Sequence, residues 1–274
     1  MIASLSDSQS QSFFQRHEFL IRRLHSLSGL IPVGAFMVVH LLANASIMNG
    51  VSSFQNIVYQ IHSIGDAVVI AEWLFIFLPI LFHALLGFVF IFTAKNNTKR
   101  YPYMGNVRYR LQRITGIVAF FFILYHVLHM NGVIHIDWFK DKVLSPIGLA
   151  QFYPYNAAST AARAMQNPII SIVYAIGVLA CVFHFANGLW TMGITWGVWV
   201  SPKAQARASN VCMGIGAIVA VFGLSAMVGL WNVDVDAAEA REVEMYQQRV
   251  KDGTVLENLH KLKVPVQDED TVMH

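Results

Sequence analysis

Five long stretches of apolar residues alternate with shorter polar segments along the chain. They cover approximately Leu24–Ile47, Ala67–Ala94, Ile114–Met130, Pro168–Trp196 and Val211–Trp231. Each is close to the ~20 residues that an α-helix needs to cross a ~30 Å hydrocarbon core. Because lipid offers no hydrogen-bonding partners to the backbone, the pattern predicts an all-α integral membrane protein, a bundle of five transmembrane helices. Pro32 and Pro79 lie inside two of these helices, where we expect local distortion.

The composition agrees with this pattern. Hydrophobic residues make up 55% of the 274 residues and charged residues 13%, whereas an ordinary soluble domain is about one quarter charged. The stretch Met1–Gln15 is rich in Ser and Gln and lacks a basic segment before an apolar core, so we expect no cleaved signal peptide. Cys181 and Cys212 lie inside predicted helices and supply neither a disulfide framework nor a cysteine-based metal site.

Basic residues are concentrated on one side of the predicted membrane. Lys95–Arg113 contains six Lys or Arg residues and no acidic one, whereas Met48–Asp66 contains no Lys or Arg. By the positive-inside rule the N-terminus is cytoplasmic, and five crossings place the C-terminus outside. The chain then has three parts: a cytoplasmic N-terminal segment (1–23), a five-helix membrane domain (24–231) and an external charged tail (232–274). In the tail, Asp236–Val250 is expected to form a surface helix of unknown role.

Four of the predicted helices each contain one deeply placed histidine: His40, His83, His126 and His184. An ionisable side chain at such a depth is costly to bury and is read by default as functional. With a helical rise of ~1.5 Å per residue, His40 and His126 lie roughly 24 Å from the inner end, and His83 and His184 roughly 17 Å from it. Two pairs at two depths fit two stacked haems, each with two imidazole ligands on its iron, which suits electron transfer.

The remaining histidines within or near the membrane have a simpler interpretation. His25, His62, His129 and His135 lie near helix ends or in loops, where we expect them to be interfacial. His129 is the main rival to His126 as a ligand, because an error of one helical turn in depth would exchange the two. Any single buried histidine can also serve only to hydrogen-bond across a helix interface.

Two glycines and two short motifs indicate an internal repeat. Gly87 and Gly188 each follow a histidine of the inner pair by four residues, on the same helix face, where a missing side chain leaves room for a flat macrocycle. Small residues are also common wherever membrane helices pack closely. The sequence FHALLG matches FHFANG in this respect, and RLHSLSG (23–29) resembles RLQRITG (110–116). The repeated unit is a pair of helices.

The motifs RRLHSLSGLIPVG, FLPILFHALLG, FTAKNN, LQRITGI and VFHFANGLW, the last followed by TWG, carry a family resemblance. They resemble the membrane-anchor cytochrome b (b558-type) subunit of succinate:quinone oxidoreductases and quinol:fumarate reductases, in the branch with one five-helix, two-haem anchor. The resemblance covers about Arg16 to Trp231 and leaves out the tail.

This resemblance implies a location, partners and cofactors. The chain would lie in the bacterial cytoplasmic membrane and anchor a flavoprotein subunit and an iron–sulfur subunit on the cytoplasmic side. It would pass electrons between the iron–sulfur subunit and quinone, expected to be menaquinone, through two haems b, and would itself contain no dicarboxylate site. His83 and His184 would hold the haem nearer these partners, and His40 and His126 the other.

Further candidates follow from the needs of haem and quinone. The possible donors to haem propionates are Arg22, Arg23, His25, Ser28 and Arg113, at the inner ends of the first and third helices. Alternatively, the arginines anchor the helices to lipid headgroups or dock the soluble subunits. Glu72 is the only acidic residue within a predicted membrane-spanning helix, and its place near the outer end makes it a candidate for the quinone site or a proton path.

Two other functions remain open at this point. One is the cytochrome b anchor of a different respiratory oxidoreductase, although such anchors usually place two ligands on one helix. The other is a transporter or non-haem bundle in which the histidines relay protons. A reduced-minus-oxidised spectrum would separate the haem proteins from the transporter.

Overall fold

The computed structural model describes residues 13–65, 67–93, 99–101, 103–131, 137–258 and 261–263. Within these ranges the regular structure is helical and no strand is present, which confirms the predicted all-α class. The spans long and apolar enough to cross a membrane are Arg16–Asn49, Ala67–Thr93, Met104–Met130, Pro168–Thr195 and Pro202–Trp231. Each of these five coincides with one of the predicted apolar stretches. His135 lies outside the described residues.

Three spans begin two to three helical turns before the apolar stretch that predicts them. The first begins at Arg16, the third at Met104 and the fifth at Pro202. The fifth shows why: the Ser201 hydroxyl accepts a hydrogen bond from the Ala204 N–H at 3.2 Å and so caps the helix well before its apolar part. Hydropathy marks where a helix enters lipid, whereas the cap marks where the helix itself begins.

The two spans with a proline in the interior of the helix depart from α geometry near that proline, as expected. Their segments are α1 (Phe13–Ser28), η1 (Gly29–Gly34), α2 (Ala35–Ala45) and η2 (Ser46–Asn49) in the first span, then α4 (Ala67–Glu72), η3 (Trp73–Phe77) and α5 (Leu78–Thr93) in the second. The turns η1 and η3 are π-helical; Pro32 lies within η1, and Pro79 follows η3 closely. Because proline has no N–H and crowds the carbonyl four residues earlier, a wider turn relieves the conflict.

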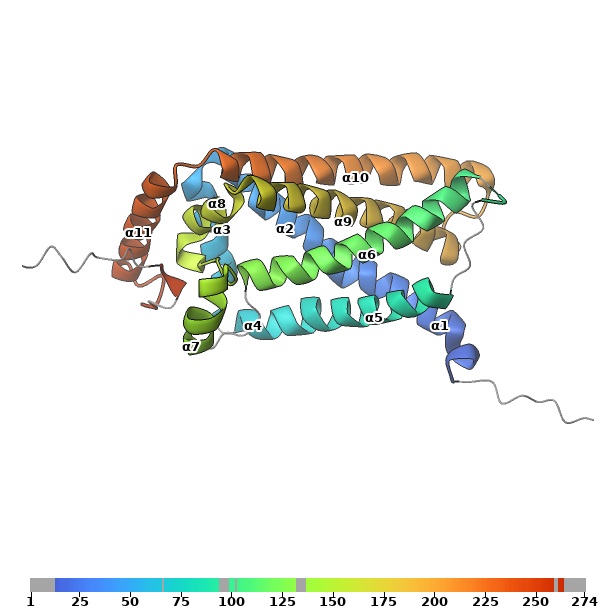
Figure 1. Cartoon of the computed structure of the whole chain (residues 1–274), viewed down its shortest axis with the longest axis horizontal. Helices are drawn as coiled ribbons and strands as arrows, with labels where there is room; N and C mark the ends of the chain where they lie inside the picture. The colour runs from blue at the N-terminus through green and yellow to red at the C-terminus, as the bar shows by residue number, and fades with distance from the viewer. Residues whose placement is uncertain are drawn as a thin grey trace, which may run out of the picture.

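The long helices lie side by side along the bundle (Figure 1). These helices are α6 (Met104–Met130), α9 (Pro168–Thr195) and α10 (Pro202–Trp231). Helix α9 packs against both α6 and α10, α2 packs on α10, and α1 packs on α5. The α4–α5 side carries strongly exposed apolar side chains such as Ile70 and Phe92, as a lipid-facing surface requires.

The two ends of the bundle differ in character. We call the end that carries Arg22, Arg23 and the first turns of α6 the basic end, and the opposite end the capped end (Figure 1). The capped end is built from α3 (Val51–His62), η6 (Pro154–Asn156), α8 (Ala157–Met165) and α11 (Val235–Lys251). The short segments α7 (Asp137–Phe139), η4 (Lys140–Leu144) and η5 (Ser145–Ile147) join α6 to this cap.

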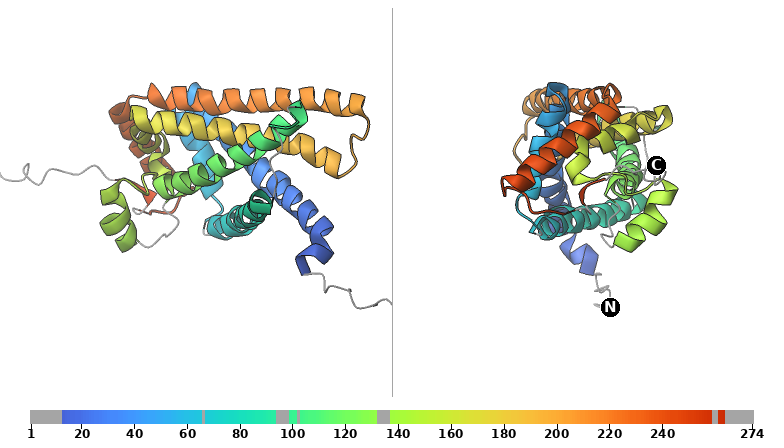
Figure 2. Two further views of the ribbon diagram at one scale, coloured as in Figure 1. Left: turned by 45° about the vertical axis from the view of Figure 1, so that its right-hand side comes forward. Right: turned by 90° about the vertical axis from the view of Figure 1, so that its left-hand side faces the viewer.

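Helix α11 lies across the capped end against α3 and α8 (Figure 2). It matches the surface helix expected over Asp236–Val250, but it is more than a surface appendage. Ala238, Glu242 and Tyr246, which recur every four residues along one face, are buried, and the Tyr246 ring packs on that of Tyr155 with centroids 5.1 Å apart. At least this part of the charged tail therefore belongs to the fold.

Glu242 is the polar anchor of α11. Its carboxylate accepts hydrogen bonds from the Ala158 N–H at 2.5 Å, the Ser159 N–H at 3.3 Å and the Ser159 hydroxyl at 2.5 Å. These groups lie at the N-terminus of α8, where backbone N–H groups lack helical partners and the helix dipole favours negative charge. Burial nevertheless raises the pKa of Glu242 to about 7, and the hydrogen bonds offset that effect only in part.

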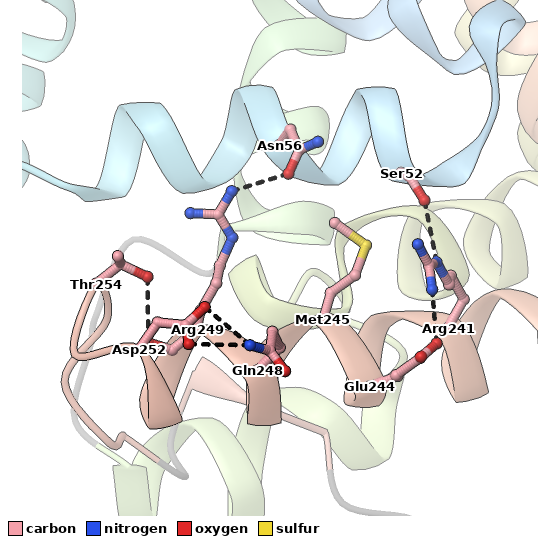
Figure 3. A pocket seen from close by; sticks show the side chains of 9 residues that line it. All are labelled: Ser52, Asn56, Arg241, Glu244, Met245, Gln248, Arg249, Asp252 and Thr254. Carbon is pink, nitrogen blue, oxygen red and sulfur yellow. Dashed lines mark hydrogen bonds and ion pairs between the residues drawn. The ribbon is translucent and has the colours of Figure 1, made fainter.

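An open groove of about 510 Å³ runs between α3 and α11 on the outside of the cap (Figure 3). Two arginines of α11 cross it to reach α3. Arg241 donates to the Ser52 hydroxyl at 3.2 Å, and Arg249 donates to the Asn56 side-chain oxygen at 2.9 Å. The groove lining contains none of the four deeply placed histidines, and its arginines hold α11 to α3.

Candidate functional site

The four deeply placed histidines meet in two pairs inside the bundle. His83 of α5 faces His184 of α9 with ring centroids 6.1 Å apart, and we call them the basic-end pair. His40 of α2 faces His126 of α6 with centroids 5.8 Å apart, and we call them the cap-end pair. This is the pairing that the depth argument predicts, with one histidine from each of four helices.

Each imidazole of the basic-end pair is oriented by a backbone carbonyl. The Nδ1 atom of His83 lies 2.8 Å from the carbonyl oxygen of His25, and the Nδ1 atom of His184 lies 3.0 Å from that of Gln112. A neutral imidazole that donates from Nδ1 to a carbonyl leaves the lone pair of Nε2 free to bind a metal. Both rings are therefore held in the tautomer of a ligand.

The repeat found in the sequence explains this symmetry. His25 and Gln112 are the third residues of RLHSLSG and RLQRITG, and each motif ends in a glycine beneath the ring that it orients. A Cβ atom on Gly29 would lie 2.3 Å from the His83 ring, and one on Gly116 would lie 2.9 Å from the His184 ring. Each motif thus supplies a carbonyl for the imidazole and the space in which the imidazole packs.

Gly87 and Gly188, predicted to leave room for a macrocycle, also face the repeat. A Cβ atom on Gly87 would lie 3.5 Å from the His25 ring, and one on Gly188 would lie 3.4 Å from the Gln112 side-chain nitrogen. These are ordinary contact distances. His25 therefore bounds the free space beside Gly87, and Gln112 bounds that beside Gly188. Contact of either glycine with a macrocycle stays a prediction.

The cap-end pair has a different environment, built from side chains. The hydroxyl oxygen of Tyr174 lies 3.3 Å from Nδ1 of His126 and 2.7 Å from Nδ1 of His129. The amide nitrogen of Asn44 lies 3.4 Å from Nε2 of His40. His129, in the last turn of α6, is only 5% exposed, so its imidazole packs inside the bundle against the hydroxyl on α9, and its depth at the membrane interface stays a prediction.

Three nitrogen atoms at the basic end are buried without a hydrogen-bond partner among the described residues: Arg23 Nε, His25 Nδ1 and Arg108 Nη2. A buried donor left unpaired costs about 1–3 kcal/mol, so native proteins rarely retain one without a purpose. Three such nitrogen atoms at one end of the bundle fit an anionic ligand such as a carboxylate. Arg23 and His25 are among the propionate donors expected from the sequence.

Arg108 is a residue that sequence reasoning did not single out. It donates to the Asn187 side-chain oxygen at 2.8 Å and to the Ser209 hydroxyl at 2.6 Å, and its guanidinium lies 3.9 Å from the centroid of the Trp190 ring. Asn187 in turn donates to the Gln112 side chain at 2.7 Å. The sequence shows Arg108 as one of several basic residues before the third span, and only its partners on α9 and α10 distinguish it.

The other predicted donors are already engaged. Arg22 is exposed and forms a salt bridge with Glu18 at 2.7 Å, and the Ser28 hydroxyl donates to the carbonyl oxygen of His25 at 2.9 Å. The Arg113 guanidinium lies 4.4 Å from the centroid of the Tyr109 ring. Of these three, Ser28 shares the carbonyl that orients His83 and so lies closest to the basic-end pair.

Glu72, the candidate for a quinone or proton path, is the last residue of α4, in the half of the second span nearer the capped end, and is half-buried. No hydrogen bond or ion pair joins it to another residue in the described ranges. A partly buried carboxylate in that state is available to a ligand or to a transferred proton. The role of Glu72 at a quinone site or in a proton path stays a prediction.

Two imidazoles alone do not fill the coordination shell of a metal ion. In the part of the chain that the structure describes, no group of three or more His, Cys, Asp or Glu side chains is placed to hold one. With the ~2 Å nitrogen-to-metal distance of imidazole ligation, two rings on opposite sides of a metal have centroids about 6 Å apart. Both pairs fit a metal whose other ligands come from a macrocycle.

Comparison with known proteins gives a matching family model and a similar protein. The family model described as succinate dehydrogenase/fumarate reductase transmembrane subunit matches residues 95–224, which include His126 and His184. The succinate dehydrogenase cytochrome b558 subunit of Bacillus subtilis (strain 168) is 35% identical over 210 residues. That match covers 77% of this chain and 96% of the relative.

Proposed function

The chain belongs to the family of succinate dehydrogenase/fumarate reductase transmembrane subunits, and from that premise we propose how its residues serve electron transfer. It is the membrane-anchor cytochrome b subunit of such a complex, an oxidoreductase. The finer proposal is that it holds two haems b in series, one at each histidine pair. The observation that carries it is the meeting of four imidazoles, from four helices, in two facing pairs.

The ligands in this proposal are His83 with His184 at the basic end and His40 with His126 at the capped end. Bound haem would supply a one-electron carrier without an open coordination position. The protein's part is to present Nε2 of each basic-end imidazole by occupying Nδ1 with a carbonyl. The buried donors Arg23, His25 and Arg108 would hold the propionates of the basic-end haem.

The partners are a flavoprotein subunit and an iron–sulfur subunit at the basic end, which in this proposal faces the cytoplasm of a bacterium. The excess of Lys and Arg in 95–113 supports that orientation. The dicarboxylate site lies in these partners and not in this chain. Succinate oxidation and fumarate reduction use the same parts, and both directions fit.

Quinone, expected to be menaquinone, would exchange electrons near the cap-end pair. Glu72 would hold or transfer a proton there, because it is the carboxylate within a span on that side of the bundle. Replacement of Glu72 by Gln in the purified complex would then slow quinone reduction and alter its pH dependence, whereas Glu244→Gln, on the exposed face of α11, would not. Unchanged kinetics in Glu72→Gln would remove this residue from the mechanism.

The ligand assignment is tested by single substitutions in the purified complex. We expect His184→Ala to lose the basic-end haem and His126→Ala to lose the cap-end haem, each lowering the haem content to about half. A redox titration of the difference spectrum would show one component missing in each variant, and a different one. His62→Ala, at the capped end but outside both pairs, is the matched control and keeps both components.

The same experiment decides against the assignment if it is wrong. Loss of the same spectral component in both variants would contradict two separate sites. A variant that lacks all four imidazoles and still carries its full pigment would exclude histidine ligation altogether. Family membership already disfavours the two alternatives considered for the sequence, another respiratory anchor and a proton-relay transporter.

A further inference from the structure

One tyrosine hydroxyl lies between two histidines next to the cap-end pair. Tyr174 of α9 is 5% exposed, and its hydroxyl oxygen is within hydrogen-bonding reach of His126 and His129 on α6. Each of these imidazoles also packs against the aromatic residue four positions earlier. Phe122 stacks on His126 at 5.9 Å and Tyr125 stacks on His129 at 5.1 Å. Both histidines are therefore held in place on two sides.

The two histidine pairs differ in what occupies Nδ1. At the basic end both Nδ1 atoms face backbone carbonyls, which no substitution of a side chain removes. At the capped end Nδ1 of His126 faces the Tyr174 hydroxyl. The orientation of this one ligand therefore depends on a side chain.

The hydrogen-bond chemistry of the three residues allows one consistent direction. A neutral imidazole that binds a metal through Nε2 carries its proton on Nδ1, so His126 donates to the Tyr174 oxygen. The Tyr174 hydroxyl has one proton of its own, and it donates this proton in the shorter hydrogen bond, 2.7 Å long, to Nδ1 of His129. His129 then accepts at Nδ1 and carries its proton on Nε2.

We propose that Tyr174 is the positioning residue of the cap-end haem ligand, and that the chain His126 to Tyr174 to His129 sets the orientation and electron donation of the His126 imidazole. The proposal rests on the proposed function, in which His126 is a ligand. It also gives His129 a role: as acceptor from Tyr174 it strengthens the hydroxyl as an acceptor from His126, since hydrogen bonds in a chain polarise one another.

The consequence for the haem is a lower reduction potential. A hydrogen bond accepted from the distal nitrogen of a ligating imidazole makes that imidazole more basic, and a more basic ligand favours the oxidised iron. Loss of the hydroxyl therefore raises the midpoint potential of the cap-end haem. The basic-end haem, whose imidazoles donate to carbonyls, keeps its potential.

The test uses Tyr174→Phe in the purified complex, which keeps the ring and removes only the hydroxyl. We expect both haems to be retained, the cap-end midpoint potential to shift upward, and the low-spin electron paramagnetic resonance signal of that haem alone to move. His129→Leu, which removes the far acceptor, should shift the same potential in the same direction by a smaller amount.

Tyr125→Phe is the matched control, because Tyr125 stacks on His129 and adjoins Tyr174 without a hydrogen bond to either histidine among the described contacts. It should leave both potentials unchanged. A shift confined to the cap-end signal of Tyr174→Phe, with both haems retained, supports the proposal, whereas loss of that haem would show a merely structural role and overturn it. Unchanged cap-end signals in Tyr174→Phe, or the same change in Tyr125→Phe, overturn it. A wild-type complex without two haem signals would instead refute the proposed function.

Discussion

Gly29 and Gly116 determine how closely the basic-end imidazoles approach the helices that orient them. At both positions a Cβ atom would lie less than 3.0 Å from a ring atom of the facing histidine, closer than packed interiors permit. The glycine lets the ring lie against the helix, within reach of a carbonyl one turn earlier. Glycine is required here by the packing of the imidazole rings and not by backbone conformation.

A prediction at this scale compares four glycines. Gly29→Ala and Gly116→Ala should displace the imidazole of His83 or His184 and lower the content of basic-end haem, leaving the cap-end component in place. Gly105→Ala in α6 and Gly214→Ala in α10, where an added methyl meets no neighbouring atom within 4 Å, are the matched controls and should keep the haem. The measurement is haem per protein with a redox titration. Equal losses in all four variants would point to helix packing in general.

The residue scale also shows where the sequence is informative. Four histidines at two depths were sufficient to predict which imidazoles face each other, because a helix converts residue number directly into depth. The surroundings of those imidazoles were not predictable in the same way. Arg108, Tyr174 and the buried position of His129 depend on contacts between different helices, and no periodicity within one helix records such contacts.

At the scale of elements, α11 shows how a polar helix becomes part of the fold. Its buried face has one apolar, one acidic and one aromatic member, Ala238, Glu242 and Tyr246, which is too sparse to read as a core stripe. Its sequence therefore predicts a solvated surface helix. Glu242 accepts its hydrogen bonds from the N-terminus of α8, which is remote in sequence. The pattern of residues within α11 therefore could not predict that this helix packs on α8.

Docking of α11 should depend on pH through Glu242. Its pKa is raised from an ordinary 4.5 to about 7, so the docked state binds the proton more tightly than the free helix does. The contribution of Glu242 is complete below about pH 4.5 and declines as the pH rises to about 7. The charge of Glu239, which lies three residues earlier on α11 and pairs with Arg163, also raises the pKa of Glu242.

The measurement is limited proteolysis of the C-terminal segment by a protease active across this pH range. Cleavage near Arg249 should accelerate from pH 5 to pH 7 in the natural sequence and should not vary with pH in Glu242→Gln. Glu242→Ala, which leaves the N–H groups of Ala158 and Ser159 without an acceptor, should cost about 1–3 kcal/mol at every pH. Cleavage that accelerates equally in Glu242→Gln would assign the pH dependence to another group.

At the scale of the whole molecule, the basic end and the capped end belong to opposite sides of the membrane. Hydropathy predicted the number of spans correctly because the cost of an unpaired backbone in lipid is large and local. It misplaced the starts of three spans by several residues, because polar turns continue a helix beyond the lipid. Charge predicts which end is cytoplasmic, and that orientation is open to direct test.

Two single cysteines would establish the orientation. Leu256, at the capped end, is 88% exposed, and Met104, at the basic end, is 73% exposed. A membrane-impermeant maleimide should label Leu256→Cys in intact cells and Met104→Cys only after the membrane is opened. The natural Cys181 and Cys212 lie within spans and give the background of the unsubstituted protein. Labelling in the reverse order would invert the topology.

The bond between Glu242 and α8 also bears on the order in which the chain is completed during synthesis. The two partners are separated by 84 positions, which a ribosome adding ~5–20 residues per second takes about 4–17 seconds to span. Until then water must satisfy the first N–H groups of α8. The histidines and the orienting carbonyls of the basic end all precede α10 in the chain. Their contacts can therefore form before α11 has been synthesised, whereas the cap is completed only after it.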